Sequence, residues 1–526
     1  MKNNLAILAI ILAAIFFLLT LLSILHHEMW RDELHSWLIA RDSSSISDLL
    51  HNKSNEGHPA LWYLCLYSIS RFTDDPIAMQ IFHLLIATGS VYLFIRFAPF
   101  TRLEKFLFIF GYYPFFEYAV LSRNYAAGIL CVIAFCIFFR RRDKNHIILS
   151  LLLFLMMQTS FHGMVIAGLL GILLIFLRIF HPPEDRDHRT YRRQSTISVV
   201  ILLAGVALCL HTMIPPSNCG IYTREHTTYE AKRAVKTLTI IWKSYIPIPY
   251  FFPGFWNTNF LDHYRNLEVI LGIILFFYFL LSFARKIPIL LVYLSGTVIY
   301  LLFHYIKFHG YNRHHGHLFL LLIICLWLSH YIKERVFPFK PLDIISGLCR
   351  KSLVVVLPLI LAANLFAALY SIRMDWNLPF TASTATIEYI REKGLVRLPI
   401  AGDVDDAILA FPAYLRRSIY YPRTDHSGTF VIYDSNIRWR KMMYWGILKR
   451  IEKLQERKKE DILIILNYRL TDRKEFKLWN EEIRERSKKT GNSSGMLEPV
   501  REFTDTIVPD EHYYLYLMKY ENREGI

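Results

Sequence analysis

Long apolar blocks alternate with short polar connections from the start of the chain to residue 369. The apolar blocks are 5–25, 77–97, 106–121, 125–139, 147–161, 164–179, 197–214, 269–283, 287–305, 318–332 and 353–369. A helix needs about 20 mostly apolar residues to cross a bilayer, so the shorter blocks must extend into their flanks. The pattern predicts an α-helical polytopic membrane protein with about 11 transmembrane helices.

Lysine and arginine gather in alternate connections between these blocks. The basic connections are 96–105, 140–144, 178–193, 285–286 and 333–351. Basic connections stay on the cytoplasmic side of a membrane, which predicts an N-in/C-out orientation. The loops 26–59 and 215–267 are then external. The short apolar run 60–72 becomes an amphipathic helix along the outer interface.

The pattern changes after Arg373, where short β-branched runs alternate with amphipathic charged runs. Strands are predicted at 398–401, 419–421, 429–433, 462–466 and 513–519, and helices at 385–391, 405–415 and 441–459. This alternation is typical of a small soluble α/β domain. We therefore divide the chain into a transmembrane module, 1–372, and an external α/β domain, 373–526. We interpret the second as a lid or an acceptor-recognition module.

Composition and charge narrow the class of protein and its partners. Of the 526 residues, 54% are hydrophobic and 20% are charged, and the mean hydropathy is +0.29. The net charge of +16 would suggest nucleic acid in a soluble protein. Here the basic residues lie between apolar blocks, where topology accounts for them, so nucleic acid is not an expected partner. The cysteines show no paired spacing, which argues against a disulfide framework or a zinc site.

Ionisable and polar residues gather at the predicted external ends of the helices. They are Asp32, Glu33, Glu56 and His58 in the first external loop, Glu117, Arg123 and Tyr125 in the hairpin between 106–121 and 125–139, His162 at the next external turn, and Lys307, His309, Arg313, His314, His315 and His317 in the connection 307–317. Ionisable groups so close to hydrocarbon are costly and by default mark a functional site. Carboxylates and cations on one face suit a reaction between an acceptor hydroxyl and a phosphate leaving group.

The chemistry of such a reaction is simple. A sugar on a polyprenyl phosphate already carries a good leaving group. A carboxylate can orient the acceptor hydroxyl and remove its proton. Arginine is best suited to the charge that grows on the phosphate, because its fork is planar and permanently charged. One carboxylate acting as base, with none acting as nucleophile, predicts inversion at the anomeric carbon.

Three motifs occur in order along the transmembrane module. They are Asp32-Glu33 just after the first membrane helix, Glu56-Gly-His-Pro-Ala-Leu-Trp-Tyr, and Ser122-Arg-Asn-Tyr at an external helix end. Together they resemble the GT-C superfamily of integral membrane glycosyltransferases. The most similar branch is family 39, which includes protein O-mannosyltransferases and the aminoarabinose transferases that modify lipid A. The resemblance extends over residues 5–369, and the C-terminal domain resembles the periplasmic α/β domain of many bacterial members.

The resemblance implies roles for several residues. Asp32 would be the general base, with Glu33 beside it in the catalytic pair. Glu56 would lie on the acceptor side or ligate a divalent ion, with His58 next to it. In the family's His-Pro-Pro motif, Ala60 replaces the second proline, so the loop differs there.

The donor side is assigned in two ways. The resemblance implies that Arg123 contacts the donor phosphate, with Tyr125 in the same motif. For Arg313, the same role is inferred only from its predicted place at an external helix end and from the chemistry of its guanidinium. His314 is a further candidate metal ligand.

Simpler interpretations stay open for these residues. Asp32 and Glu33 can be an acidic pair at a helix N-terminus, stabilised by the helix dipole. Arg123 can extend along the apolar surface to reach the interface. The spacing of His314, His315 and His317 fits no standard metal site.

We therefore expect an inverting glycosyltransferase with its site and C-terminal domain on the periplasmic face of a bacterial inner membrane. It would move one sugar from a polyprenyl-phosphate donor to a hydroxyl of a lipid, glycan or protein. Membrane lipids are further partners. The only candidate cofactor is a divalent metal ion. One alternative is a transporter or flippase of lipid-linked sugars, which would place ionisable residues near the bilayer midplane. Another is a glycan ligase that uses a polyprenyl-diphosphate donor.

Overall fold

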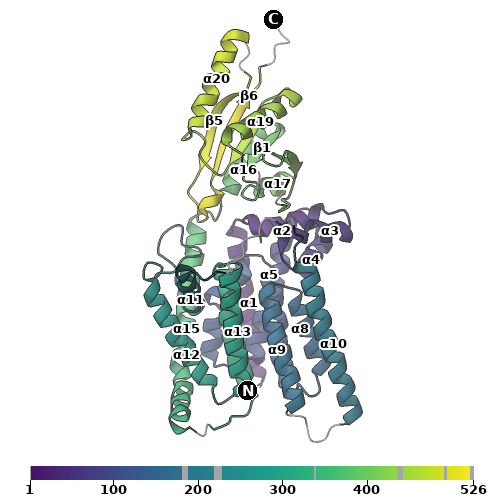
Figure 1. Ribbon diagram of the computed structural model, residues 1–526, viewed down its shortest axis with the longest axis vertical. Coiled ribbons are helices and arrows are strands. Elements are labelled where there is room, and N and C mark those ends of the chain that lie inside the picture. Colours follow the sequence, from purple (N-terminus) through teal and green to yellow (C-terminus); the bar gives the residue numbers. More distant parts are fainter. Residues whose placement is uncertain are drawn as a thin grey trace.

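The computed structural model describes residues 2–180, 187–217, 219, 228–336, 339–434, 442–490 and 494–521. A bundle of helices forms the larger part of the molecule, and a smaller C-terminal domain containing a β-sheet stands at one end of it (Figure 1). The N-terminus lies at the opposite end of the bundle (Figure 1).

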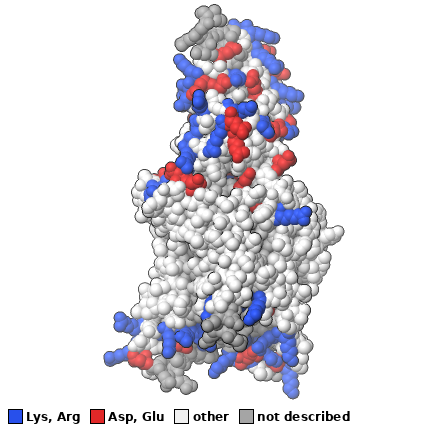
Figure 2. All heavy atoms as spheres, turned by 180° about the vertical axis from the view of Figure 1, so that it is seen from behind, with Lys and Arg blue, Asp and Glu red and all other residues white. Residues whose placement is uncertain are grey.

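Seven helices among the described residues are long and apolar enough to cross a membrane. They are α1 (Lys2–His26), α5 (Ile77–Phe97), α9 (Phe161–Phe180), α10 (His188–Met213), α12 (Arg265–Phe283), α13 (Ile287–Ile306) and α15 (Lys340–Asn377). Figure 2 shows that the middle of the bundle is almost free of charged side chains on the face in view. The chain is therefore a multi-pass membrane protein.

The remaining predicted spans form shorter helices. These are α6 (Arg102–Ile109), the π-helix η2 (Tyr112–Val120), α7 (Tyr125–Phe139), α8 (His146–Met157) and α14 (Asn312–Ser329). The predicted span 106–121 is divided at Gly111, where a Cβ atom would lie 3.0 Å from the carbonyl oxygen of Leu107 and 3.2 Å from Cβ of Asn364. Helix α14 is buried along almost its whole length. The total of about 11 spans and the orientation stay predictions.

Short helices cover the end of the bundle that faces the C-terminal domain. They are α2 (Arg31–Asp42), α3 (Ile46–Asn52), the 3-10 helix η1 (Ser54–Glu56), α4 (Leu61–Ser70) and α11 (Ala231–Tyr245). The first predicted external loop, 26–59, is thus largely helical. Helix α4 corresponds to the predicted amphipathic run 60–72.

The C-terminal domain follows α15, which continues to Asn377, slightly beyond the predicted boundary at 373. Its helices are α16 (Ser383–Glu392), η3 (Leu395–Arg397), α17 (Ala410–Leu415), α19 (Tyr444–Lys458), α20 (Lys474–Thr490) and η4 (Pro509–Glu511). Its strands are β1 (Ile400–Asp403), β2 (Ile419–Tyr421), β3 (His426–Gly428), β4 (Ile462–Leu466), β5 (Met496–Phe503) and β6 (Tyr513–Lys519).

The sheet of this domain is mixed, with the order β3-β2-β1-β4-β6-β5. Strand β1 runs parallel to β2 and β4, with Ala401 opposite both Tyr420 and Ile464. Strand β6 is antiparallel to β4 and β5, and β3 is antiparallel to β2. The architecture is α/β, with the fully buried strand β4 at its centre.

A separate apolar cluster joins the two parts of the molecule. Leu34, Trp37 and Leu38 of α2 are buried in it together with Leu409 and Val431 of the C-terminal domain. Apolar surface removed from water contributes about 25 cal/mol per Å². The C-terminal domain is therefore packed against α2 and not merely tethered by the chain.

Candidate active site

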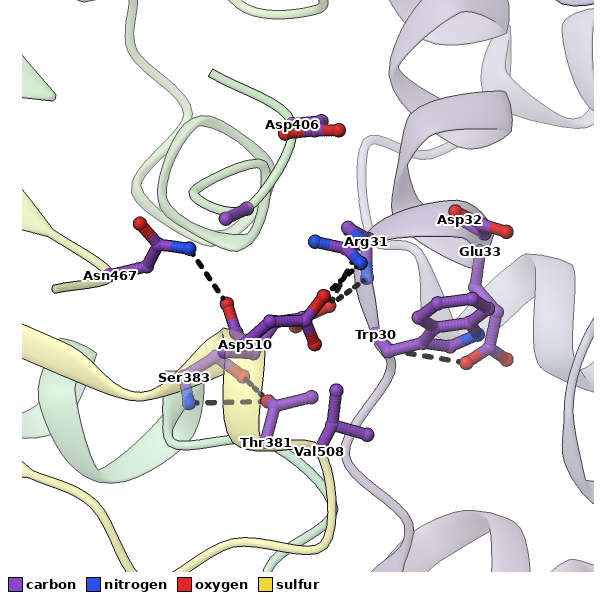
Figure 3. A network of polar contacts seen from close by, with 12 residues as sticks. Trp30, Arg31, Asp32, Glu33, Thr381, Ser383, Asp406, Asn467, Val508 and Asp510 are labelled. Carbon is purple, nitrogen blue, oxygen red and sulfur yellow. Dashed lines mark hydrogen bonds and ion pairs between the residues drawn. The ribbon is translucent and has the colours of Figure 1, made fainter. Parts of the chain in front are cut away.

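Helix α2 carries the two adjacent acids, and their side chains point in different directions (Figure 3). Asp32 lines a cavity of about 570 Å³. The carboxylate of Glu33 is buried outside this lining and accepts the backbone N–H groups of Trp30 at 3.2 Å and Ser122 at 2.6 Å. Successive residues of a helix are rotated by about 100°, so the two acids leave α2 in different directions. Glu33 therefore stabilises the start of α2, which was the simpler interpretation of an acidic pair.

Two arginines from distant parts of the sequence flank Asp32. Nη2 of Arg313 donates to Oδ2 of Asp32 at 3.1 Å. Nη1 of Arg123 lies 3.7 Å from the same oxygen and donates to the Asp32 backbone carbonyl. Burial alone would raise the pKa of Asp32, but the guanidinium of Arg123 and then that of Arg313 outweigh it and hold this pKa below its usual range. Asp32 is therefore an ionised carboxylate and a weak base while both arginines are paired with it.

Several hydrogen-bond donors of this cluster are buried without a partner among the described residues. They are Nε of Arg123, the hydroxyl of Tyr125, and Nε and Nη1 of Arg313. All three residues line the cavity. A buried donor without a partner costs about 1–3 kcal/mol, and native proteins leave few of them. The cluster therefore has the hydrogen-bonding capacity for an anion with several oxygen atoms.

Aromatic rings fix the orientation of Arg313. Its Cζ atom lies 4.8 Å from the ring centroid of Trp30, 4.7 Å from that of Tyr311 and 5.6 Å from that of Trp256. Trp256 is itself held by Glu117, which accepts its Nε1–H at 3.0 Å. Cations stacked on aromatic rings are attracted by the negative faces of the rings. The donors of Arg313 are thus aimed at a fixed place.

Glu56 and His58 line the same cavity, on either side of Gly57. Gly57 has a φ of 65°, in the left-handed region that favours glycine, and it ends η1. Oε2 of Glu56 lies 3.2 Å from Nδ1 of His35, and Nε2 of His35 donates to the carbonyl of Val431 at 2.9 Å. Because both ring nitrogens face oxygen acceptors, His35 is an imidazolium. Burial lowers the pKa of His35, but the carboxylate of Glu56 outweighs this and raises it.

The candidate metal ligands do not fit a divalent ion. Glu56 faces the cationic ring of His35, and Nδ1 of His314 accepts the Tyr311 backbone N–H at 3.0 Å. Within the described ranges, no group of three or more His, Cys, Asp and Glu side chains is placed to hold a metal ion. Burial and then the charge of Arg123 lower the pKa of His58 to about 4, so its ring is neutral at pH 7.

The rest of the cavity wall is largely apolar. Its apolar residues are Phe161, Met213, Ile214, Pro215, Phe303 and Phe308, and Tyr433 joins them from the C-terminal domain. Ser160, His162 and Lys307 are the polar residues of this part of the lining. The apolar residues lie at or just beyond the ends of α9, α10 and α13. The cavity therefore combines a cluster of opposite charges with an apolar wall at the ends of membrane helices.

Most of the residues predicted from the sequence meet at this cavity. The structure brings together Asp32, Glu56, His58, Arg123, Tyr125, Arg313 and His314, and it leaves Glu33 out of the lining. Sequence reasoning missed His35 and Tyr433. His35 follows Asp32 by three residues and shares its face of α2, a spacing that was visible. Tyr433 approaches from another domain, which no local pattern reveals.

Neither a family model nor a curated protein sequence matches the chain. Among solved structures, the cryo-EM structure of the arabinofuranosyltransferase AftD from mycobacteria is similar with a TM-score of 0.38 and 10% sequence identity. The similarity covers 98% of this chain, which spans 40% of the length of the AftD chain. A likeness of this size does not establish a shared fold, so the function below is inferred from the cavity.

Proposed function

We propose that the protein is an inverting membrane glycosyltransferase that moves a single sugar from a polyprenyl-phosphate donor to an acceptor hydroxyl. One observation carries the proposal: Asp32 lies between Arg123 and Arg313 in a cavity with an apolar wall. Such a reaction needs a base, cations for the leaving group and an apolar surface for the lipid. The cavity contains side chains suited to each of these tasks.

The donor phosphate would bind to the unpaired N–H groups of Arg123 and Arg313 and to the hydroxyl of Tyr125. Arginine presents several donors in a rigid planar fork and keeps its charge. Donors that are already oriented stabilise the growing negative charge without reorganising during the reaction. The polyprenyl chain would follow the apolar wall, which includes Phe161 and Phe303, toward the membrane.

In the transfer step, Asp32 takes the proton of the acceptor hydroxyl while the acceptor oxygen forms a bond to the anomeric carbon. The bond between that carbon and the phosphate oxygen breaks, and its electron pair leaves with the polyprenyl phosphate. Attack opposite the leaving group inverts the anomeric centre, since one carboxylate acts as base and none as nucleophile. General-base catalysis of this kind contributes about 10²–10⁴-fold to the rate.

Donor binding also activates the base. Before the donor arrives, both arginines pair with Asp32 and lower its pKa. A phosphate on the same arginines shares their charge and adds negative charge beside the carboxylate, which raises the proton affinity of Asp32. Asp32 is then able to accept the proton of the acceptor, a lipid, glycan or protein hydroxyl held near Glu56 and His58.

We place the cavity and the C-terminal domain on the periplasmic face of a bacterial inner membrane. Lysine and arginine side chains gather at the end of the bundle opposite the C-terminal domain (Figure 2). Basic ends of membrane helices stay in the cytoplasm. This distribution supports the predicted N-in/C-out orientation.

Product analysis tests the proposal. Mass spectrometry of envelope glycolipids and glycoproteins from a deletion strain should show the loss of one sugar. Wild-type protein should restore this sugar, whereas Asp32→Asn, present in the membrane at the wild-type level, should not. Full activity of Asp32→Asn would refute the role of Asp32.

Purified protein then identifies the carrier. We expect a covalent product from a panel of polyprenyl-monophosphate sugars. A product from diphosphate-linked donors alone would indicate a glycan ligase. Movement of lipid-linked sugar across a vesicle membrane without a covalent product would indicate a flippase.

A further inference from the structure

In helix α2, which carries Asp32, Glu33 accepts the N–H of the N-cap residue Trp30, but the Trp30 side chain accepts no N–H of the first turn. The first N–H groups of a helix lack partners within it, and a Ser, Thr, Asp or Asn side chain usually accepts one of them. Trp30 occupies this position in α2 and makes no side-chain cap hydrogen bond. The N–H of Arg31, the first residue of the helix, therefore needs an acceptor from elsewhere.

The C-terminal domain supplies this acceptor. Glu511 lies in η4, just before β6, and is completely buried. Its Oε1 atom accepts the backbone N–H of Arg31 at 3.0 Å, next to Asp32 in the sequence. The guanidinium of Arg31 also pairs with Asp510 (Figure 3). Its Nε atom lies 3.9 Å from Oε1 of Glu511.

The domain contacts α2 at two further places along the helix. In the middle, Nε2 of His35 donates to the carbonyl of Val431 at 2.9 Å. Near the end, Nη1 of Arg41 donates to the carbonyl of Ala413 at 3.2 Å. The helix is thus held by the C-terminal domain from its first turn to its last.

We infer that the C-terminal domain is a structural part of the active site, and that Glu511 is a positioning residue that holds Asp32 in the cavity by capping α2. The task of Asp32 itself rests on the function proposed above. Glu511 is not part of the cavity lining and acts only through the N–H of Arg31. Without this acceptor the first turn of α2 frays, and Asp32 no longer stays between Arg123 and Arg313.

Arg31→Pro and Arg31→Ala form a matched pair that isolates the hydrogen bond. Both substitutions remove the guanidinium and its ion pairs, but only proline removes the N–H. Proline is favoured at the first position of a helix. Trp30 already has φ −92° and ψ 171°, the extended backbone that a residue before proline adopts. Glu511→Gln, which keeps an oxygen acceptor, is the conservative control.

Undecaprenyl phosphate is the probe, measured on the full-length protein in lipid nanodiscs. Asp32 competes with the phosphate of the probe for the two arginines, so a displaced Asp32 should tighten binding. We expect Arg31→Pro to bind the probe about 3- to 10-fold more tightly than Arg31→Ala, a difference within the range of coupled neighbouring residues. The difference should vanish when both variants also carry Asp32→Asn. Amide hydrogen exchange in residues 32–36 should be faster in Arg31→Pro than in Arg31→Ala, and Glu511→Gln should match the wild type.

Two results would overturn the inference. One is equal probe affinity and equal exchange in Arg31→Pro and Arg31→Ala. The other is that Arg31→Pro binds the probe more weakly than Arg31→Ala, both with and without Asp32→Asn. The hydrogen bond between Arg31 and Glu511 would then contribute to stability alone. Failure of the wild-type protein to bind the probe would instead refute the proposed donor, and the hydrogen-exchange comparison would then decide the inference by itself.

Discussion

The carboxylate of Glu33 accepts the backbone N–H of Ser122 at 2.6 Å and so ties helix α2 to the turn that carries Arg123. Its other oxygen accepts the N–H of Trp30 at 3.2 Å and lies 3.3 Å from Nε2 of His27. Glu33 is therefore the junction between the two parts of the sequence that supply Asp32 and Arg123. One acid of the adjacent pair lines the cavity, and the other joins the elements around it.

Glu33→Ala should destabilise the protein by about 1–3 kcal/mol for each of the two buried backbone N–H groups, those of Trp30 and Ser122, that lose their acceptor. Burial works against the charge of His27, but the carboxylates of Asp375 and then Glu33 raise the pKa of His27 to about 10, so its ring is protonated. Thermal unfolding in detergent measures the loss. Glu33→Gln should lose less, and Asp32→Asn, which faces the cavity, should melt close to the wild type. An unchanged melting temperature in Glu33→Ala would contradict the role of Glu33.

Asp32→Asn should bind undecaprenyl phosphate about 10-fold more tightly than the wild type, equivalent to about 1.4 kcal/mol, while losing sugar transfer. The substitution removes the carboxylate that pairs with Arg123 and Arg313 and leaves their charge to the phosphate. Titration in nanodiscs at a fixed salt concentration gives the affinity. The matched control is Asp343→Asn, an arginine-paired acid outside the cavity lining, which should bind as the wild type does. Weaker binding by Asp32→Asn would mean that Asp32 helps to hold the phosphate.

Arg313→Lys should raise the KM for the donor more than it lowers kcat, although the charge is kept. Lysine lacks the Nε and Nη1 donors of Arg313 and its planar stacking on Trp30 and Tyr311. Losing a hydrogen bond to a charged group costs about 1.5–3 kcal/mol, roughly 10-fold or more in donor affinity. Arg71→Lys, a stacked arginine outside the cavity lining, should keep wild-type kinetics. Equal effects of Arg313→Lys and Arg71→Lys would contradict the role of Arg313 in binding the donor phosphate.

The folded protein should lose stability as the pH rises and the buried Glu511 ionises. Burial, partly offset by Arg31, raises the pKa of Glu511 to about 8. An acid with a raised pKa in the folded protein stabilises the fold below its ordinary pKa, and this contribution is lost as the pH rises through the raised value. The melting temperature of the wild type relative to Glu511→Gln should thus fall from about pH 5 to about pH 8 and then level off. A difference that does not change with pH would show that Glu511 is ionised in the fold.

The sequence was most informative about the ends of the helices. Asp32 and Arg313 are 281 residues apart and form an ion pair. Charge patterning predicted that they share one side, because basic connections determine which helix ends face the cytoplasm. The rotation of α2 was not predicted, because 26–59 was interpreted as an external loop, although Leu34, Trp37 and Leu38 form an apolar stripe that orients the helix. Glu33 was for that reason placed beside Asp32 in the site.

The C-terminal domain shows a different limit. The predicted strands 462–466 and 513–519 coincide with β4 and β6, because buried central strands are continuous apolar runs. Strand β5 was missed because it lies at the edge of the sheet, carries Pro499 and exposes half of its side chains. The predicted strand 429–433 is not a strand. Val431 in that segment packs against α2, and contacts between distant elements leave no local pattern.

Helix α2 belongs to the membrane module in sequence but is held in place by the C-terminal domain, and this limits which chimaeras of the protein can be active. The segment after Asn377 is a natural breakpoint for making chimaeras, because the membrane module ends there in sequence. A foreign C-terminal domain joined at that point would bring no acceptor for the N–H of Arg31 and no carbonyl for His35. Chimaeras that retain activity should therefore take α2 and the segment around Glu511 from the same parent protein.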